Sequence, residues 1–115
     1  MYQFILDAVG GNVADARALL TTLFDSGREQ FEEMRAAIKE ENRYRLSQAA
    51  HQLAGATATC GMSDISASLR DIENNANEAA FDEIETQVEK LFLLMQGAEK
   101  DCDAVLENLA KKTSS

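Results

Sequence analysis

The stretch FDEIETQVEKLFLLMQGAEKDCDAVLENL, from Phe81 to Leu109, decides the fold. Apolar residues recur along it at steps of three and four: Ile84, Val88, Leu91, Leu94 or Met95, Ala98, Cys102, Val105 and Leu109. Because an α-helix has about 3.6 residues per turn, such steps place the apolar side chains on one side of the helix. A seam of this length predicts a long helix that packs in a bundle.

The rest of the chain has the same helical periodicity. A short apolar lead-in, residues 4–9, is expected to end at Gly10 and Gly11, and Asn12 can then cap a long helix to about Glu41. Gly27 is expected to break or bend that helix. Its apolar residues at helical spacing are Leu19, Leu20, Leu23, Phe24, Phe31, Met34 and Ile38.

Two more helices complete the predicted fold. One spans about 42–60 and is closed by Gly61, and the next is capped by Ser63 and buries Ile65, Leu69 and Ile72. The run NNAN at 74–77 is a turn, and the tail KKTSS is expected to be frayed. We predict an all-α protein: an antiparallel four-helix bundle with a short N-terminal lead-in helix, forming one domain over residues 1–115.

Composition excludes several classes of function. The chain has 115 residues, no proline and a formal net charge of −9, from 20 acidic against 11 basic residues. Nucleic acid and anionic membranes are therefore poor partners. The chain shows no apolar run long enough for a membrane span and no signal peptide, so we expect a cytoplasmic protein and a monomer. Cys60 and Cys102 are expected to be reduced core residues.

The only histidine lies in the stretch HQLAGATATCG, from His51 to Gly61. Counting about 100° per residue places the apolar stripe of this helix on the opposite side from His51, which therefore points outward. That stripe comprises Leu46, Ala49, Leu53, Ala56, Thr57 and Cys60. The neighbours of His51 on the outer face are Tyr44, Ser47, Gln48, Ala54, Gly55 and Ala58, and we take them as candidates for contact with a partner.

Gly55 distinguishes this histidine from an ordinary surface histidine. A glycine within a helix costs about 0.8–1.0 kcal/mol relative to alanine, and here it leaves a shallow hollow beside the imidazole that a macromolecule could approach. Two other roles for His51, in a catalytic Cys–His pair and in a metal site, are excluded. Cys60 lies about 180° around the helix from His51, so the two form no thiolate–imidazole pair, and a metal site lacks a second histidine.

The sequence resembles a known family at this point. His51-Gln52-Leu53-Ala54-Gly55-Ala56, followed by Gly61 and by Ile65, Leu69, Ile72 and Glu73, is similar to the signature of histidine phosphotransfer (HPt) domains, commonly written H-x-L-K-G-S/A. The order and lengths of the predicted helices also resemble that family of four-helix bundles. The chain departs from the signature at Ala54, where the family carries a lysine.

The resemblance implies a role for each site residue. His51 would accept a phosphoryl group from an aspartate of a receiver domain and pass it to another, and Glu73 would orient the imidazole. Mg²⁺ would come from the receiver, so the chain itself would need no cofactor or metal and would be a phosphocarrier rather than an enzyme with turnover. Partners would be receiver domains of response regulators or a hybrid sensor histidine kinase. Arg43, Arg45 and Arg70 are candidate sources of positive charge.

A second interpretation is that the protein binds partners through the same surface but does not transfer phosphate. Ala54 in place of the lysine is compatible with a helical interaction module that binds receivers or other signalling domains and carries no phosphate. Acid-labile phosphate on His51 distinguishes the two readings.

Overall fold

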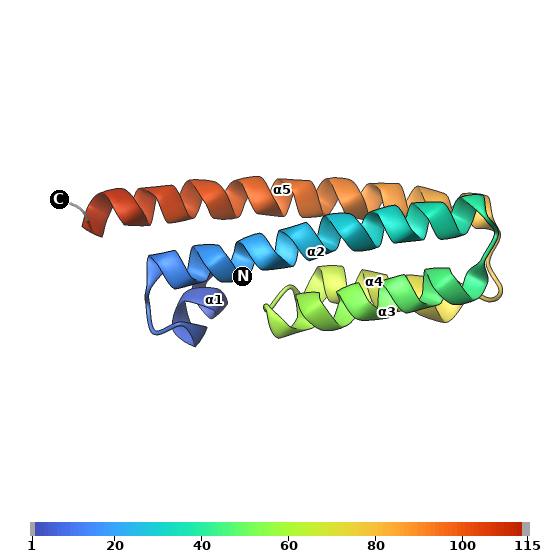
Figure 1. Cartoon of the computed structure of the whole chain (residues 1–115), viewed down its shortest axis with the longest axis horizontal. Helices are drawn as coiled ribbons and strands as arrows, with labels where there is room; N and C mark the ends of the chain where they lie inside the picture. The colour runs from blue at the N-terminus through green and yellow to red at the C-terminus, as the bar shows by residue number, and fades with distance from the viewer. Residues whose placement is uncertain (1, 114–115) are drawn as a thin grey trace.

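The computed structural model describes residues 2–113, and the side chains of residues 4–111. It confirms the all-α prediction. The helices are α1 (Tyr2–Ala8), α2 (Val13–Lys39), α3 (Arg43–Thr59), α4 (Ser63–Asn75) and α5 (Phe81–Thr113). Successive long helices α2 to α5 alternate in direction along a body of 54 × 19 × 18 Å (Figure 1). The two longest helices, α2 and α5, lie side by side, and α3 and α4 cover only part of their length.

Two asparagines cap helices: Asn12, as the sequence predicts, and Asn42, which was not predicted to be a cap. The side chain of Asn12 accepts a hydrogen bond from the backbone N–H of Asp15, and that of Asn42 accepts one from Arg45, both at 3.0 Å. These bonds satisfy amide groups that the first turn of a helix leaves without a partner. Ser63, however, is not a cap. Met62 occupies the cap position without a side-chain bond, and Ser63 is the first helical residue of α4.

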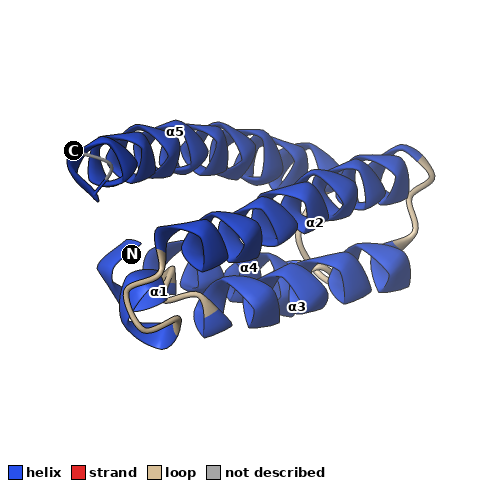
Figure 2. Ribbon diagram, turned by 60° about the vertical axis from the view of Figure 1, so that its left-hand side comes forward, coloured by secondary structure: helices blue, strands red, loops and turns tan. Residues whose placement is uncertain are grey.

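The turn between α3 and α4 depends on Gly61. Its φ of +78° is a left-handed conformation that side chains rarely adopt, and the N–H of Met62 donates to the carbonyl of Thr57 at 2.8 Å to close α3. A Cβ atom on Gly61 would lie 2.9 Å from the ring of Phe4. Helix α1 therefore packs against this turn, as the turned view in Figure 2 shows.

Gly27 does not break α2, so the first of the two predicted effects of this glycine, a break, is wrong. The helix continues from Val13 to Lys39, and Gly27 is buried within it. The reason is packing: a Cβ at this position would lie 2.8 Å from the Cε of Met95, so the absent side chain admits a methionine of α5.

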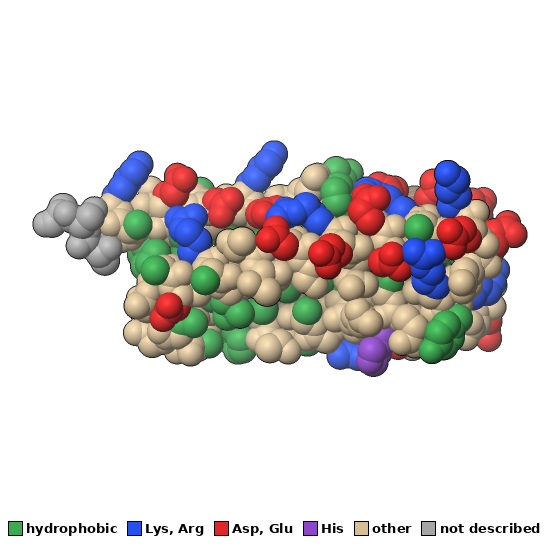
Figure 3. All heavy atoms as spheres, viewed as in Figure 1, with side chains coloured by type: hydrophobic (Ala, Val, Ile, Leu, Met, Phe, Trp, Pro, Cys, Tyr) green, Lys and Arg blue, Asp and Glu red, His purple; other side chains and the backbone are tan. Residues whose placement is uncertain are grey.

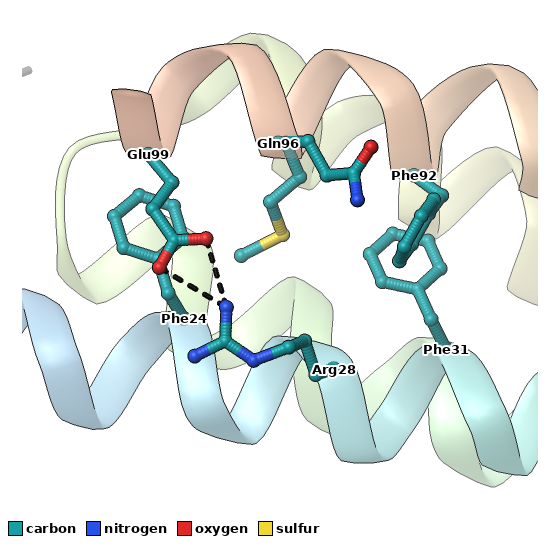
Figure 4. A pocket seen from close by; sticks show the side chains of 8 residues that line it. Phe24, Arg28, Phe31, Phe92, Gln96 and Glu99 are labelled. Carbon is teal, nitrogen blue, oxygen red and sulfur yellow. Dashed lines mark hydrogen bonds and ion pairs between the residues drawn. The ribbon is translucent and has the colours of Figure 1, made fainter. Parts of the chain in front are cut away.

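Aromatic rings and an ion pair join α2 to α5 around this contact. Phe31 and Phe92 meet edge to face with ring centroids 5.4 Å apart. Arg28 donates two hydrogen bonds to Glu99, at 2.8 and 3.0 Å, and both pairs are visible in Figure 4. These contacts hold the two longest helices together along the part that α3 and α4 also cover.

The structure differs from the sequence prediction in which apolar residues of α5 and α2 are buried. Met95 is buried while Leu94 is exposed, and the seam passes through Leu106, with Val105 half-buried. In α2, Leu19 is exposed. Residues 111–113, expected to be frayed, continue α5, whereas 114–115 lie outside the described residues.

The remaining sequence expectations concern the cysteines and the membrane. Cys60 and Cys102 are free and buried, and burial raises the pKa of both thiols, that of Cys102 to about 11. Both thiols therefore stay protonated at neutral pH and act as core residues. None of the helices within residues 2–113 combines the length and the apolar character needed to cross a bilayer.

Candidate functional site

His51 projects from the outer face of α3 and meets a carboxylate from α4. Its Nδ1 lies 2.8 Å from Oε2 of Glu73. The His51 side chain is 61% exposed and that of Glu73 only 24%. The structure thus brings into contact two residues that are 22 positions apart in the sequence. The contact is possible because α4 packs closely along α3. The α4 residues Leu69 and Ile72 are buried in the core.

The contact fixes which imidazole nitrogen is free. A carboxylate only accepts hydrogen bonds, so a neutral imidazole must carry its proton on Nδ1 to bind Glu73. The Nε2 atom then keeps its lone pair, and no other side chain among residues 4–111 binds the ring. An exposed imidazole held at one nitrogen and open at the other can act as a nucleophile.

The structure places the candidate docking residues on the outer face of α3, with one exception. Tyr44 is 74% exposed, Gln48, Gly55 and Ala58 are exposed, and Ser47 is half-buried. Ala54 is buried, with no exposed surface. It therefore contributes no side chain to the docking surface.

The burial of Ala54 has a physical cause that a single apolar stripe does not reveal. Helix α3 packs against both α2 and α4, so its buried face is wider than the stripe that includes Leu53. The carbonyl of Ala54 accepts hydrogen bonds from the hydroxyls of Ser66 in α4, at 2.8 Å, and Thr57, at 3.1 Å. The Ser66 bond joins α4 to α3 at this fully buried alanine.

Ser66 was not singled out from the sequence, although it contributes to the site. Its hydroxyl joins α4 to α3 at Ala54, and so helps to set the position of α4 from which Glu73 reaches His51. A signal was present in the sequence. Ser66 lies four residues after Met62 and three before Leu69, both buried, so a polar residue interrupts the apolar side of α4.

The surface around Gly55 is open. A Cβ atom at Gly55 would have no heavy atom within 4 Å, so no neighbouring side chain requires a glycine there. Gly55 follows His51 by one turn on the same side of α3. The absence of a side chain therefore leaves clearance beside the imidazole rather than room for packing inside the protein.

Charge is distributed unevenly over the molecule. Helix α3 contains no aspartate or glutamate, in a chain that has 20. In Figure 3, acidic side chains gather over α2 and α5, whereas the histidine lies at the opposite edge of the molecule. The helix that carries His51 is thus the least acidic surface of an acidic protein.

Two of the three candidate arginines are engaged elsewhere. Arg43 donates to the carbonyls of Ala76 and Ala79, both at 2.8 Å, and stacks over the ring of Phe81. It holds the loop between α4 and α5.

Arg45 forms ion pairs with Glu33 and Glu40. These contacts raise the pKa of Arg45 and lower that of Glu33. Arg70 is exposed and forms no hydrogen bond or ion pair with the described residues.

Comparison with known families agrees with this geometry. The family model for the Hpt domain matches residues 18–111, which include His51, Gly55 and Glu73. The chain belongs to the Hpt domain family. Hpt domains act in histidine phosphotransfer within phosphorelays in general. No curated protein and no solved structure matches the chain. Among the described residues of this Hpt domain, no group of three or more histidine, cysteine or acidic side chains is placed to hold a metal ion.

Proposed function

We propose that His51 relays a phosphoryl group between the aspartates of receiver domains in a multistep phosphorelay. The observation that supports this most directly is the 2.8 Å contact between Nδ1 of His51 and Glu73, which leaves Nε2 of an exposed imidazole available for attack. In this proposal His51 is the phospho-acceptor and Glu73 is a positioning residue.

The chemistry needs only these two side chains from this chain. The lone pair of Nε2 forms a bond to phosphorus, the bond between phosphorus and the aspartyl oxygen breaks, and the carboxylate leaves with the electron pair. The ring gains positive charge because Nδ1 keeps its proton. Glu73 stabilises that charge through the same hydrogen bond. Transfer to a second aspartate is the reverse of these steps.

The partners in the proposal are receiver domains of response regulators or of a hybrid sensor histidine kinase. A receiver would supply Mg²⁺, which is bound by carboxylates and therefore requires an acidic pocket. Helix α3 carries no carboxylate of its own, so it can approach such a pocket without like-charge repulsion. We propose further that the protein acts as a cytoplasmic monomer and as a phosphocarrier, with no turnover reaction of its own.

The docking surface in this proposal lies on both sides of the histidine. Tyr44 offers a large exposed ring two turns before His51, and Gly55 and Ala58 form a low surface after it. Ser47 and Gln48 lie between Tyr44 and His51. A flat surface of small side chains lets the edge of a partner come close enough for the transfer distance.

The test uses a panel of receiver domains phosphorylated with acetyl phosphate. Each is incubated with the parent protein and with His51→Gln, and the transferred phosphate is mapped by mass spectrometry and tested for acid lability. We expect acid-labile phosphate on the parent and none on the variant, with unchanged melting temperatures because His51 lies outside the core. Phosphate on the variant would contradict the assignment of His51. Receiver binding without any transfer would favour the docking module that carries no phosphate.

A further inference from the structure

Arg70 is the one arginine without a partner among the residues that the structure describes. Of the others, four pair with carboxylates and one binds backbone carbonyls: Arg17, Arg28, Arg35, Arg45 and Arg43. Arg70 is exposed and makes no such contact. In a protein of net charge −9, one guanidinium is left free.

The position of Arg70 places that free charge at the site. Arg70 lies on α4, one helical turn before Glu73, and residues three apart on a helix share a face. Glu73 in turn binds Nδ1 of His51. Arg70 is the only basic residue of α4.

The neighbouring carboxylates do not neutralise Arg70. Glu73, the acid on the same face, is engaged by His51. Asp71 lines the groove between α4 and α5, together with Ile72 and Lys90. The guanidinium is therefore available for an anion that arrives at the imidazole.

Helix α3 offers no alternative cation. Its two basic residues are Arg43, which binds the α4–α5 loop, and Arg45, which pairs with Glu33 and Glu40. A phosphoryl group on His51 would bring two negative charges and several acceptor oxygens to an exposed surface. Among the basic residues of α3 and α4, Arg70 is the one that the described residues leave unpaired.

We infer that Arg70 binds the phosphoryl group while it is attached to Nε2 of His51, an inference that rests on the proposed function. A guanidinium presents several N–H donors in one plane and matches phosphate oxygens well. Glu73 then holds one side of the imidazole and Arg70 holds the group that the other side carries. The two residues, one turn apart on α4, act on opposite charges of the same phosphohistidine.

The experiment uses phosphoramidate, a small phosphoryl donor that needs no partner protein. Nε2 of His51 bonds to phosphorus as the phosphorus–nitrogen bond of the donor breaks, and the nitrogen leaves as ammonia. The proteins compared are the parent, Arg70→Gln, Arg70→Lys and Lys100→Gln. Lys100 is an exposed residue of α5, and its replacement removes the same charge away from the site. Phosphohistidine is followed by ³¹P NMR and mass spectrometry.

We expect Arg70→Gln to slow phosphorylation of His51 by about three- to tenfold at low ionic strength, the range of one exposed charge contact. Arg70→Lys should retain part of the rate, and Lys100→Gln should match the parent. The difference between the parent and Arg70→Gln should shrink as salt is raised, because an exposed contact is screened. A loss of helix stability would produce none of this salt dependence, and the melting temperatures should agree.

Two results would overturn the inference in distinguishable ways. If the parent takes up phosphate on His51 and Arg70→Gln does so at the same rate at low salt, Arg70 does not contact the phosphoryl group, and the proposed function stands. If the parent takes up no phosphate on His51 from phosphoramidate or from phosphorylated receivers, the proposed function fails and the inference fails with it.

Discussion

Oε2 of Glu73 lies 2.8 Å from Nδ1 of His51, so a side chain of α4 sets the orientation of the one imidazole on α3. The contact depends on how α4 packs against the core and against α3. Leu69 and Ile72 anchor α4 in the core, and Ser66 bonds to the backbone of α3. The proposed nucleophile and its proposed positioning residue thus belong to different helices, and their separation is set by helix packing.

Replacing Glu73 with alanine should slow phosphoryl acceptance by His51 about tenfold, which corresponds to losing about 1.4 kcal/mol of transition-state stabilisation from a charge-assisted hydrogen bond. Stability should change little, because the contact is partly exposed. ¹⁵N NMR of the ring should show the Nδ1–H tautomer dominant in the parent and not in the variant. Glu78→Ala, at an exposed position without this contact, is the control. Equal rates in Glu73→Ala and the parent would remove Glu73 from the mechanism.

Replacing Gly55 with a larger residue should raise the stability of the bundle and lower the rate of phosphoryl transfer. Gly55→Met is expected to stabilise the bundle by up to about 1 kcal/mol through helix propensity, since a Cβ there meets no other atom. Transfer from a phosphorylated receiver should become slower, while phosphorylation by the small donor phosphoramidate stays the same. The matched control is Gly97→Met in α5, where a Cβ is equally unobstructed. It should raise the melting temperature without slowing transfer. Clearance is not the role of Gly55 if both variants transfer at the parent rate.

Ala54→Lys tests the finding that Ala54 is buried, at the position where the family signature has lysine. Because the methyl of Ala54 is fully buried between α3 and α4, a longer side chain should lower the free energy of unfolding by about 1–3 kcal/mol through overpacking. Ala58→Lys adds the same side chain at an exposed position of α3 and should be close to neutral. Urea unfolding of the two variants measures the difference. Equal stabilities would mean that the α3–α4 interface has room for the lysine stem.

The ion pair between Arg35 and Glu89 predicts a dependence of stability on pH. Arg35 donates to Glu89 at 2.7 and 2.9 Å, and this hydrogen bond is the main reason that the pKa of Glu89 lies below its ordinary value. A lowered pKa in the folded state means that the stabilisation is present above the unfolded pKa and is lost as pH falls through the folded pKa. Glu89→Gln should therefore lower the melting temperature at pH 7 by a small amount, because the pair is partly exposed.

At pH 3 the parent and Glu89→Gln should differ less than at pH 7, since acid protonates the parent carboxylate. Thermal unfolding followed by circular dichroism at both pH values provides the comparison. Glu107→Gln, at an exposed position of α5, controls for the removal of one charge. A difference that is as large at pH 3 as at pH 7 would show that ionisation of Glu89 does not stabilise the fold.

Local features of the sequence predicted the helices well. The cap at Asn12 and the closing glycine Gly61 act within one or two turns of the chain, so neighbouring residues suffice to recognise them. The outward direction of His51 follows from the same kind of information, because helical periodicity relates it to Leu46 and Leu53 on its own helix.

Other features depended on residues far away in the sequence. Periodicity gave no reason to choose Met95 over Leu94, because adjacent residues both lie near the edge of an apolar stripe. Gly27 decided the choice, since its missing side chain admits Met95. The hydrogen-bond partners of Arg43 and Arg45 likewise lie on other helices or loops, and no local pattern reveals them.

The sequence by itself determined an all-α bundle, the turns at Gly10, Gly11 and Gly61, and an outward histidine beside a glycine, because these follow from backbone preferences and from the period of the helix. The turn predicted at 74–77 begins later, because α4 continues to Asn75. Only the tertiary structure decided that Ala54 is buried and that Arg70 is the arginine left unpaired among the described residues. It also showed that Glu73 contacts His51, which the sequence had suggested only through a family resemblance. The physical reason is that burial and charge pairing depend on the rotation and spacing of helices against one another, and these are set by packing across the whole core.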